Sequence, residues 1–481
     1  WYQVPEDAAT SVSAQLQGTV ANNMVVLSDG EVVVFYKDNN LNAWKSSLDN
    51  GSTWSSPGTL FPFAVTSQST ITADSDQNDK IHIAFKTGHF QITYANFNGA
   101  SWSSPSQINT IATTPNDTIG FTQISVDRDG IIHLMWQQGN HKNSAILSTC
   151  WYAKSDDGGT TFSTPVSLSQ SNSYDAAFPV ADFSGNSSDT LLIAWRENIT
   201  PFDQQIGMNN WNWDIKAAIS TDHGNSWGLP FTIVGSGDDD WDPNVVIDKN
   251  NIIHVFFHVY HDNTPFDSDA RVYHVYSTDA GVSWSTETQL SESNIRSHLV
   301  KTAYDYTNNL TWCFWKDERD FTLGNPKADL MGISLSYDGN LDINELEFIT
   351  NHDTVEISYH NFKAGADGIV RATYNNSVSE GFGDTLYYTQ RSPILAGNSS
   401  FANDETPLLF PNPASNYISI TDKVANNSKY EIYSISGVKI KEGVIGAVSE
   451  IDISSLHQGA YILKIHQTSQ HSNYRFIKSD L

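Results

Sequence analysis

The chain has 481 residues, too many for one compact core of ordinary size and suited to a large domain with a small one. It carries 54 acidic against 26 basic side chains, a formal net charge of -28, so we expect neither nucleic acid nor an anionic membrane as a partner. No apolar run is long enough to cross a bilayer, so no transmembrane segment is expected. Because the chain opens at Trp1 without a start Met, we interpret it as a mature form from which a leader has been removed.

An eight-residue pattern, Ser/Thr-x-Asp-x-Gly-x-Ser/Thr-aromatic, recurs at residues 47–54, 155–162, 220–227 and 277–284, with weaker copies at 98–102 and 336–339. In a hairpin turn the Gly supplies a positive φ, the Asp accepts hydrogen bonds from nearby N–H groups, and the aromatic residue packs under the sheet. The pattern resembles the Asp-box, or BNR repeat, of the sialidase-like propellers. That resemblance implies a structural role for the box aspartates, Asp49, Asp157, Asp222 and Asp279.

A second pattern, an apolar strand that ends in an aromatic and then a polar residue, has seven copies along the chain. The copies lie roughly 50–60 residues apart, which is the length of one propeller blade of four short strands. We therefore predict an all-β protein with a seven-bladed β-propeller over residues 1–393. Residues 1–17 are expected to supply the outer strand of the seventh blade, so that no sheet edge is exposed. Six-bladed closure, as in sialidases, is the alternative.

The last part of the chain has a different composition. Residues 394–404 are predicted to be a linker, and residues 405–481 contain alternating apolar and polar strands that predict a small β-sandwich. The segments Leu409–Ala414, Glu431–Gly437 and Gly459–Lys464 resemble, in order, the type A C-terminal sorting domain of type IX secretion. This implies contact with the type IX translocon and sortase, removal of the tail, and a secreted or surface location on a Gram-negative bacterium. A generic carbohydrate-binding sandwich is the alternative.

The residues that end the seven repeated strands are all able to donate a hydrogen bond from nitrogen, and four of them are cations. In propellers of this kind the ends of these strands lie at the mouth of the central pocket, so we predict a site for a sugar that bears a carboxylate or a sulfate. Alternatively, these cations pair with acidic neighbours such as Glu197. The seven residues are Lys37, Lys86, Gln137, Arg196, His258, Lys316 and Asn375. Three nearby residues, Arg296, His298 and Arg319, are added as candidate substrate ligands.

Two kinds of catalysis fit the residues near that mouth. Glycoside hydrolysis needs two carboxylates with separated pKa values, and Glu197, Asp242 and Asp317 are the candidates. A β-elimination needs a base and an acid beside a cation that neutralises a uronate. His258, Tyr260 and Arg196 are the candidates for those roles.

The resemblance to sialidases has a clear limit, because no Arg precedes Arg128 and the Phe/Tyr-Arg-Ile-Pro motif is absent. The residue types at the mouth resemble those of propellers that cleave uronate polysaccharides such as ulvan with His, Tyr and Arg. We therefore predict an exported, monomeric propeller that acts on a uronate, sulfated or sialylated glycan by hydrolysis or elimination. A non-catalytic glycan-binding or adhesive surface protein is the alternative.

Some polar residues are predicted to have other roles. His82, His133 and His254 precede their strand aromatics by three residues and are expected to be satisfied core histidines. The acidic run 238–240 is a candidate for Ca²⁺ binding, although a solvated acidic turn is favoured. No metal site is assigned.

Overall fold

The computed structural model contains β-strands and no helices in the part of the chain that it describes. The described ranges are 7–10, 22–38, 41–56, 58–59, 71–87, 91–108, 119–139, 147–169, 175–183, 189–200, 212–261, 269–319, 328–344, 346–350, 356–377, 385–391, 409–410, 414–420, 428–434, 439–445, 450–456, 459–466 and 471–478. No helix in these ranges could span a membrane. The chain divides into two compact units, Trp1–Ser392 and Pro393–Leu481. The predicted linker, 394–404, lies outside the described residues.

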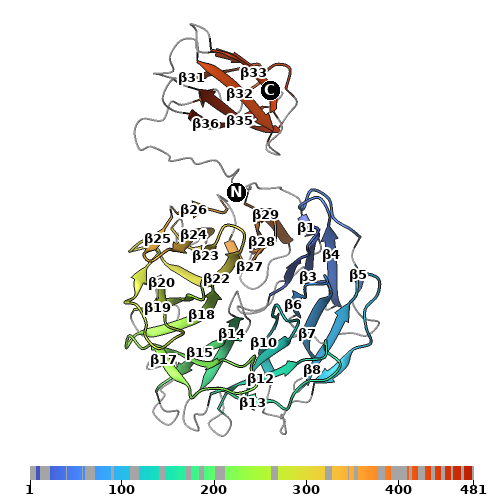
Figure 1. Ribbon diagram of the computed structural model, residues 1–481, viewed down its shortest axis with the longest axis vertical. Helices are drawn as coiled ribbons and strands as arrows, with labels where there is room; N and C mark the ends of the chain where they lie inside the picture. Colours follow the sequence, from blue (N-terminus) through green and yellow to red (C-terminus); the bar gives the residue numbers. More distant parts are fainter. Residues whose placement is uncertain are drawn as a thin grey trace. The chain divides into compact units, whose positions relative to one another are not determined.

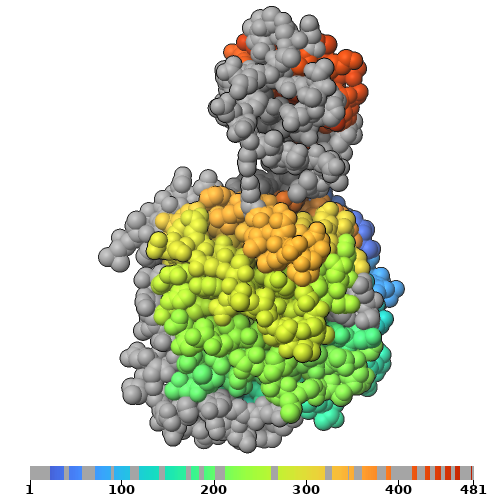
Figure 2. Space-filling view, turned by 60° about the vertical axis from the view of Figure 1, so that its left-hand side comes forward, coloured from blue at the N-terminus to red at the C-terminus, as the bar shows by residue number. Residues whose placement is uncertain are grey.

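The described strands of the larger unit form seven antiparallel sheets. Figure 1 shows these sheets arranged around a common axis, as in a β-propeller. In Figure 2 the colours pass in chain order from green through yellow to orange across one face, so consecutive sheets are neighbours. We number the sheets as blades one to seven in chain order.

Blade one contains β2 (Met24–Val26), β3 (Val32–Asp38), β4 (Leu41–Ser47) and β5 (Gly58–Thr59). Blade two contains β6 (Ile71–Ser75), β7 (Ile81–Thr87), β8 (Gln91–Phe97) and β9 (Ser106–Ile108). Blade three contains β10 (Ile119–Val126), β11 (Ile132–Gln138), β12 (Thr149–Ser155) and β13 (Val166–Ser167). Blade four contains β14 (Ala176–Phe183), β15 (Leu191–Asn198), β16 (Trp213–Ser220) and β17 (Phe231–Val234).

Blade five contains β18 (Asp239–Ile247), β19 (Ile253–Tyr260), β20 (Ala270–Ser277) and β21 (Thr288–Gln289). Blade six contains β22 (Ser297–Asp305), β23 (Leu310–Asp317), β24 (Asp329–Tyr337), β25 (Leu341–Ile343) and β26 (Glu347–Phe348). Blade seven contains β27 (Glu356–Ala364), β28 (Val370–Ser377), β29 (Thr385–Gln390) and, from the N-terminus, β1 (Asp7–Thr10).

The N-terminal strand β1 is the outer strand of blade seven. It pairs antiparallel with β29, with Asp7 opposite Tyr387 and Thr10 opposite Thr385. This is the place that the sequence predicted for an N-terminal strand. Strands from the two ends of the unit therefore share one sheet, which covers the edge of β29 with backbone hydrogen bonds.

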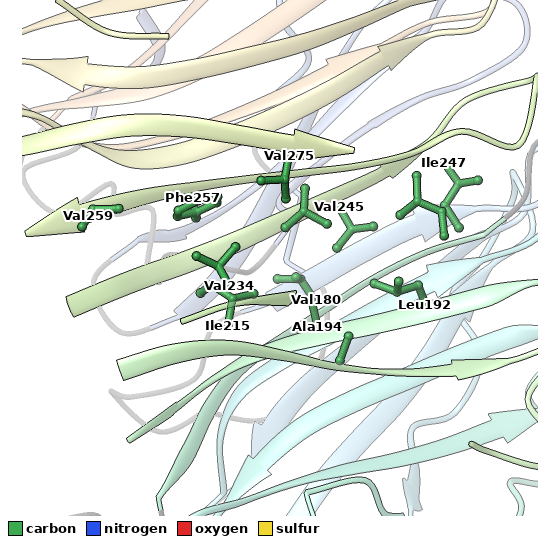
Figure 3. Packing of buried hydrophobic residues seen from close by; sticks show 13 residues of the cluster. Val180, Leu192, Ala194, Ile215, Val234, Val245, Ile247, Phe257, Val259 and Val275 are labelled. Carbon is green, nitrogen blue, oxygen red and sulfur yellow. The ribbon is translucent and has the colours of Figure 1, made fainter. Parts of the chain in front are cut away.

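Hydrophobic side chains fill the space between neighbouring blades. Figure 3 shows this core between blades four and five, where side chains from β14 to β17 meet side chains from β18 to β20. The labelled members are Val180, Leu192, Ala194, Ile215, Val234, Val245, Ile247, Phe257, Val259 and Val275. Each is 6% exposed or less, so each large apolar side chain contributes roughly 1.5–3 kcal/mol to stability.

The Asp-box turns have the hydrogen bonds that the motif predicts. In the blade-three box, Thr161 donates to Asp157 from its hydroxyl at 2.6 Å and from its backbone N–H at 2.9 Å. The Gly159 N–H donates to Ser155 Oγ at 2.9 Å. The Thr161 hydroxyl, followed by its N–H group and the Ser155 hydroxyl, lowers the pKa of Asp157 to about 2. The Asp side chain therefore stabilises the turn as a carboxylate.

The glycine of the box also fits against the preceding blade. Gly159 has φ +89°, and a Cβ at this position would overlap the hydroxyl end of Tyr94 in β8. The Phe162 ring packs edge-on against Tyr94, with 5.3 Å between the ring centroids. The same overlap would occur between Gly51 and Tyr388, which belong to blades one and seven. The same kind of contact therefore joins blades two and three, which are consecutive in the chain, and blades seven and one, where the ring closes.

The three predicted core histidines are buried, and the prediction is confirmed. His82 Nδ1 lies 2.7 Å from the Tyr94 hydroxyl, and His133 Nδ1 lies 2.8 Å from the Tyr152 hydroxyl. His254 Nδ1 lies 3.0 Å from His274 Nε2. Burial lowers the pKa of all three core histidines, that of His254 to about 4, so they are neutral at pH 7.

The smaller unit contains two sheets around a separate hydrophobic core. One sheet contains β30 (Leu409–Phe410), β31 (Tyr417–Ile420) and β34 (Glu450–Asp452). The other contains β33 (Lys439–Val444), β32 (Lys429–Ser434), β35 (Gly459–His466) and β36 (His471–Lys478). Ile418, Ile432 and Leu463 are fully buried in this core.

The contact between Gly159 and the preceding blade predicts that two glycine-to-alanine substitutions lower the free energy of unfolding by very different amounts. Gly159→Ala should lower the free energy of unfolding by about 3 kcal/mol, because the methyl group meets Tyr94 and the positive φ adds strain. Gly99→Ala is the control: Gly99 has φ +86°, but a Cβ there would meet no atom within 4 Å, so the loss should be about 1 kcal/mol. Urea unfolding of both variants measures the difference. Equal losses would contradict the steric role of Tyr94.

Candidate functional site

In each of blades three to six, the innermost strand has a β-bulge, and this bulge lies opposite the end of the second strand. The residue that precedes each bulge pairs with one of the predicted mouth residues: Gly120 with Gln137, Ala177 with Arg196, Trp241 with His258, and His298 with Lys316. The predicted alignment of these four residues therefore holds in four consecutive blades, whereas in blade seven the residue before the bulge, Ile357, pairs with Asn376 rather than with the predicted Asn375. Antiparallel pairing places these strand ends at the opposite end of each blade from the Asp-box turns.

The first bulge residue has a positive φ in each of these blades. Its values are 46° at Phe121, 59° at Phe178, 47° at Asp242 and 56° at Leu299. Three of the four residues are apolar, and Asp242 is the charged exception. Asp242 is 4% exposed, and burial raises its pKa while Arg196 and Lys301 oppose the rise. A buried charge at a strained backbone position costs stability, so Asp242 is a candidate functional residue.

Arg196 lies near the end of β15 and is enclosed by aromatic rings. Its guanidinium carbon lies 3.6 Å from the Trp241 ring centroid, 4.0 Å from that of Phe178 and 4.7 Å from that of Trp213. Its Nη1 lies 3.4 Å from Asp242 Oδ1. Burial lowers the pKa of Arg196 to about 10, so the side chain remains a cation at pH 7. Stacked rings and one carboxylate hold this charge in place.

His258 lies beside Arg196 in the next blade and is fully buried. Neither of its ring nitrogens has a hydrogen-bond partner among the residues that the structure describes. Its ring packs edge-on against Tyr260, with centroids 5.0 Å apart, and lies 6.1 Å from the ring of His298. Burial, and then the nearby His298 and Arg196, hold the pKa of His258 well below its usual range. Burial raises the pKa of Tyr260 to about 12.

At pH 7, His258 is therefore a neutral imidazole with a free nitrogen lone pair, and Tyr260 is a protonated phenol. A proton acceptor and a proton donor thus lie in contact beside the Arg196 cation. Such a pair has the protonation states that an acid and a base need for proton transfer.

Glu318 is the centre of a second charged group, in blade six. Its carboxylate accepts hydrogen bonds from Arg296 Nη1 at 2.8 and 2.9 Å and lies 3.0 Å from His298 Nε2. Lys316 Nζ lies 3.4 Å from the same carboxylate. Burial opposes ionisation, but His298, Lys316 and Arg296 together hold the pKa of Glu318 below its usual range. Three predicted sugar ligands therefore converge on one carboxylate, to which the sequence assigned no role.

Glu197 and Asp317, predicted as catalytic carboxylates, have a repeated structural contact. Trp195 Nε1 donates to Glu197 Oε2 at 3.2 Å, and Trp315 Nε1 donates to Asp317 Oδ2 at 3.3 Å. In blade three the amide of Gln138 accepts the equivalent bond from its own tryptophan at 3.3 Å. Because a neutral amide accepts the same hydrogen bond there, the tryptophan contact does not require a negatively charged acceptor. Asp317 also accepts hydrogen bonds from Arg319 Nε at 2.8 Å and from the Ser297 hydroxyl at 3.2 Å.

Among the described hydrogen bonds, ion pairs and ring contacts, none joins Lys86 or Gln137 to Arg196 or His258. Burial lowers the pKa of Lys86, and Gln137 is 5% exposed with no described partner for its Oε1. Asn375 is buried in β28. The Lys37 side chain lies outside the described residues.

The acidic run predicted as a possible Ca²⁺ site does not converge on one point. Asp238 lies 3.1 Å from His261 Nδ1, Asp239 accepts the Trp213 N–H at 3.2 Å, and Asp240 accepts the Ser236 hydroxyl at 2.8 Å. Among the described residues, the group whose ligand atoms lie close enough to share an ion is Asp127, Asp129 and His223. It lies in the turns after β10 and β16, at the Asp-box end of the blades.

Comparison with known proteins accounts for the smaller unit. Residues 408–479 match the secretion system C-terminal sorting domain. The chain carries a sorting domain. It is therefore exported by type IX secretion and is secreted or held at the cell surface, as the sequence predicted. No curated protein sequence matches the chain.

Solved structures resemble the larger unit. A polysaccharide lyase described as an ulvan lyase, bound to -[GlcA(1-4)Rha3S]-, aligns with a TM-score of 0.54 and 14% identity over 79% of this chain and 94% of its own. A second ulvan lyase structure aligns with a TM-score of 0.55 and 15% identity over 80% and 95%. A leech intramolecular trans-sialidase aligns with a TM-score of 0.41 and 12% identity over 81% and 70%. With the sheet arrangement, the ulvan lyase likeness confirms the all-β propeller fold class.

No sequence pattern indicated a functional role for Lys301, Trp241 or Glu318. Trp241 follows the acidic run, and it covers the guanidinium group of Arg196. Lys301 lies within a strand of mixed polar and apolar residues, Ser297–Asp305, where alternation alone gives no functional meaning. The repeated Trp-x-Gln/Glu/Asp segments at 136–138, 195–197 and 315–317 were a visible pattern that could have indicated the structural contact of Glu197.

The sorting domain predicts a separation of folding from export. Deleting residues 402–481 should leave a folded propeller, because Trp1–Ser392 is a compact unit with its own cores. The truncated chain should stay inside the producing cell, whereas the full chain reaches the surface or the medium. Immunodetection in cell, surface and medium fractions, with thermal melting of the retained protein, tests both points. Normal delivery of the truncated chain would refute the prediction.

The tryptophan contact predicts that Glu197→Gln changes neither stability nor activity appreciably. The Gln side chain can accept the Trp195 hydrogen bond as Gln138 accepts it in blade three, so the melting temperature should stay within about 2 °C of the parent value. Turnover or binding of a responsive glycan should change less than about twofold, far below the loss expected for a catalytic carboxylate. A hundredfold loss of turnover in a folded Glu197→Gln variant would instead return this residue to a catalytic role.

Proposed function

We propose that the propeller cleaves an acidic polysaccharide that contains uronate, by β-elimination, after export from the cell. The observation that carries this proposal is the contact of neutral, buried His258 with protonated Tyr260, next to the Arg196 cation. These are the three functional groups that an elimination from a uronate requires. The sorting domain places the protein outside the cell, where polysaccharides are found.

The reaction assigns one role to each group. His258 accepts the proton on C5, next to the uronate carboxylate, and the Arg196 charge stabilises the negative charge that develops on that carboxylate. The C4–O bond then breaks, a C4–C5 double bond forms, and Tyr260 donates its phenolic proton to the leaving oxygen. Atoms and charge balance without a cofactor or an added water molecule.

The ulvan lyase with its bound glucuronate-containing sugar supports this choice by likeness of fold only, since the identity is 14%. Hydrolysis is less favoured, because Glu197 and Asp317 serve tryptophan contacts and Asp242 pairs with Arg196. Uronate, sulfated and sialylated glycans all fit a cationic site, and we favour uronate because elimination needs the acidic proton beside its carboxylate.

The test is incubation of the full chain with a panel of uronate, sulfated and sialylated polysaccharides. Both new reducing ends and the ultraviolet absorbance of unsaturated products are recorded. We expect both to rise together with a uronate polymer. Reducing ends without absorbance would indicate hydrolysis, and binding without products would indicate the non-catalytic alternative.

Substitutions then test the residue roles. Tyr260→Phe and His258→Gln should each lower kcat/KM by about 10²–10⁴, because each removes one proton transfer. His261→Gln is the matched control, since His261 is partly exposed and contacts Asp238 and Tyr273 rather than the His258 group. It should retain activity within about twofold. Thermal melts separate a catalytic loss from unfolding, and full activity in both site variants would contradict the assigned roles.

A further inference from the structure

A cavity of about 400 Å³ that is partly open to solvent lies along the axis of the propeller. Its lining takes residues from each of the seven blades, from Asn22 ahead of β2 to Lys363 in β27. His258, Tyr260 and Glu318 are not part of this lining. Lys301 and Asn244 line the cavity immediately after their bulges, so they lie next to the candidate site but belong to a different space.

Lys301 is a buried cation in this cavity. It is 6% exposed, and among the described residues its ammonium group forms no hydrogen bond and no ion pair within 4.0 Å. Lys363, the other lysine of the lining, has Asp74 Oδ1 at 2.8 Å. Burial lowers the pKa of Lys301 to about 8, and the charge of Asp242 opposes this shift. The Lys301 ammonium group thus has no anion in contact although its side chain is largely removed from water, and the cavity is where a partner can reach it.

Two further polar residues of the lining matter for its charge balance: one has an atom without a partner, and the other offsets only part of the positive charge. Gln123 is 6% exposed, and its buried Oε1 has no described hydrogen-bond partner. Asp182 is the second acidic residue of the lining, and burial raises its pKa to about 7, so it carries only part of a negative charge at pH 7. Lys301, Lys363 and Arg128 therefore outweigh Asp74 and Asp182 around the cavity. This positive interior occurs in a chain of net charge -28.

We propose that the axial cavity is a binding site for a small anion with a carboxylate or sulfate group, with Lys301 as its charge partner. The ammonium group makes a charge-assisted hydrogen bond to the anionic group, and Gln123 Oε1 accepts a hydrogen bond from a hydroxyl group when the ligand is a sugar acid. The volume exceeds that of an inorganic ion and suits a single acidic sugar unit with water. The site is independent of the proposed elimination, because it shares none of the groups that move protons.

The experiment is calorimetric titration of the full chain with sodium sulfate and, separately, with sodium glucuronate, in sodium chloride that keeps the ionic strength constant. We expect saturable binding of at least one of the two anions. Binding of glucuronate alone identifies a sugar acid as the ligand, and binding of sulfate as well identifies a site for the anionic group itself. Saturable binding of neither anion would overturn the proposal.

Two variants locate the binding. Lys301→Met keeps the length of the side chain without its charge and should weaken binding by at least about tenfold. Gln123→Met leaves the lysine in place and should weaken the binding of glucuronate by several fold, which keeps the proposal testable if Lys301→Met fails to fold. Lys249→Met, which changes a lysine outside the cavity lining, is the control and should bind as the parent does. Unchanged affinity in Lys301→Met, or in Gln123→Met when the first variant does not fold, would overturn the assignment.

Discussion

Tyr94 in β8 lies directly under Gly159 of the next blade's Asp box, where no Cβ can fit. Equivalent contacts join Tyr152 to Gly224 and Tyr388 to Gly51. Each tyrosine reaches from the third strand of one blade into the turn of the following blade, and the box aromatic packs on the same ring. Because the Tyr388 contact joins blade seven to blade one, it acts together with the pairing of β1 and β29 to close the ring.

The closed ring makes a functional site possible at the other end of the blades. Bulges in the inner strands of blades three to six occur at one common register, and the ring brings them around one axis. Phe121 and Phe178 pack against each other there, with ring centroids 3.8 Å apart. The aromatic residues near blade four exclude water from Arg196, and the next two blades supply His258, Tyr260 and His298. Adjacent blades thus contribute different chemical groups to one region.

The distribution of charge follows from this architecture. Exposed acidic residues give the protein its negative surface, whereas Arg196, Arg296, Lys301 and Lys316 are brought together at the inner ends of the blades. Glu318 and Asp242 offset part of that positive charge. Histidines among such cations stay neutral, since protonation would add another buried positive charge. A neutral base can therefore exist beside a buried cation, as the proposed elimination requires.

Most of the fold could be predicted from repeated local patterns in the sequence. The Asp boxes, the repeated apolar strands and the sorting-domain segments depend on turn chemistry and on side-chain alternation, which are properties of short stretches of chain. The sequence also placed Arg196, His258 and Tyr260 near one mouth, because each lies at the end of the second strand of its blade. Only the tertiary structure decided which group pairs with each charged side chain. Arg196 pairs with Asp242 of the next blade rather than with its neighbour Glu197, which faces Trp195. Lys316 pairs with Glu318, two residues away, while Asp317 holds Arg319. Alternation along a strand sends adjacent residues to opposite faces, so their contacts depend on how blades pack, and no local pattern contains that information.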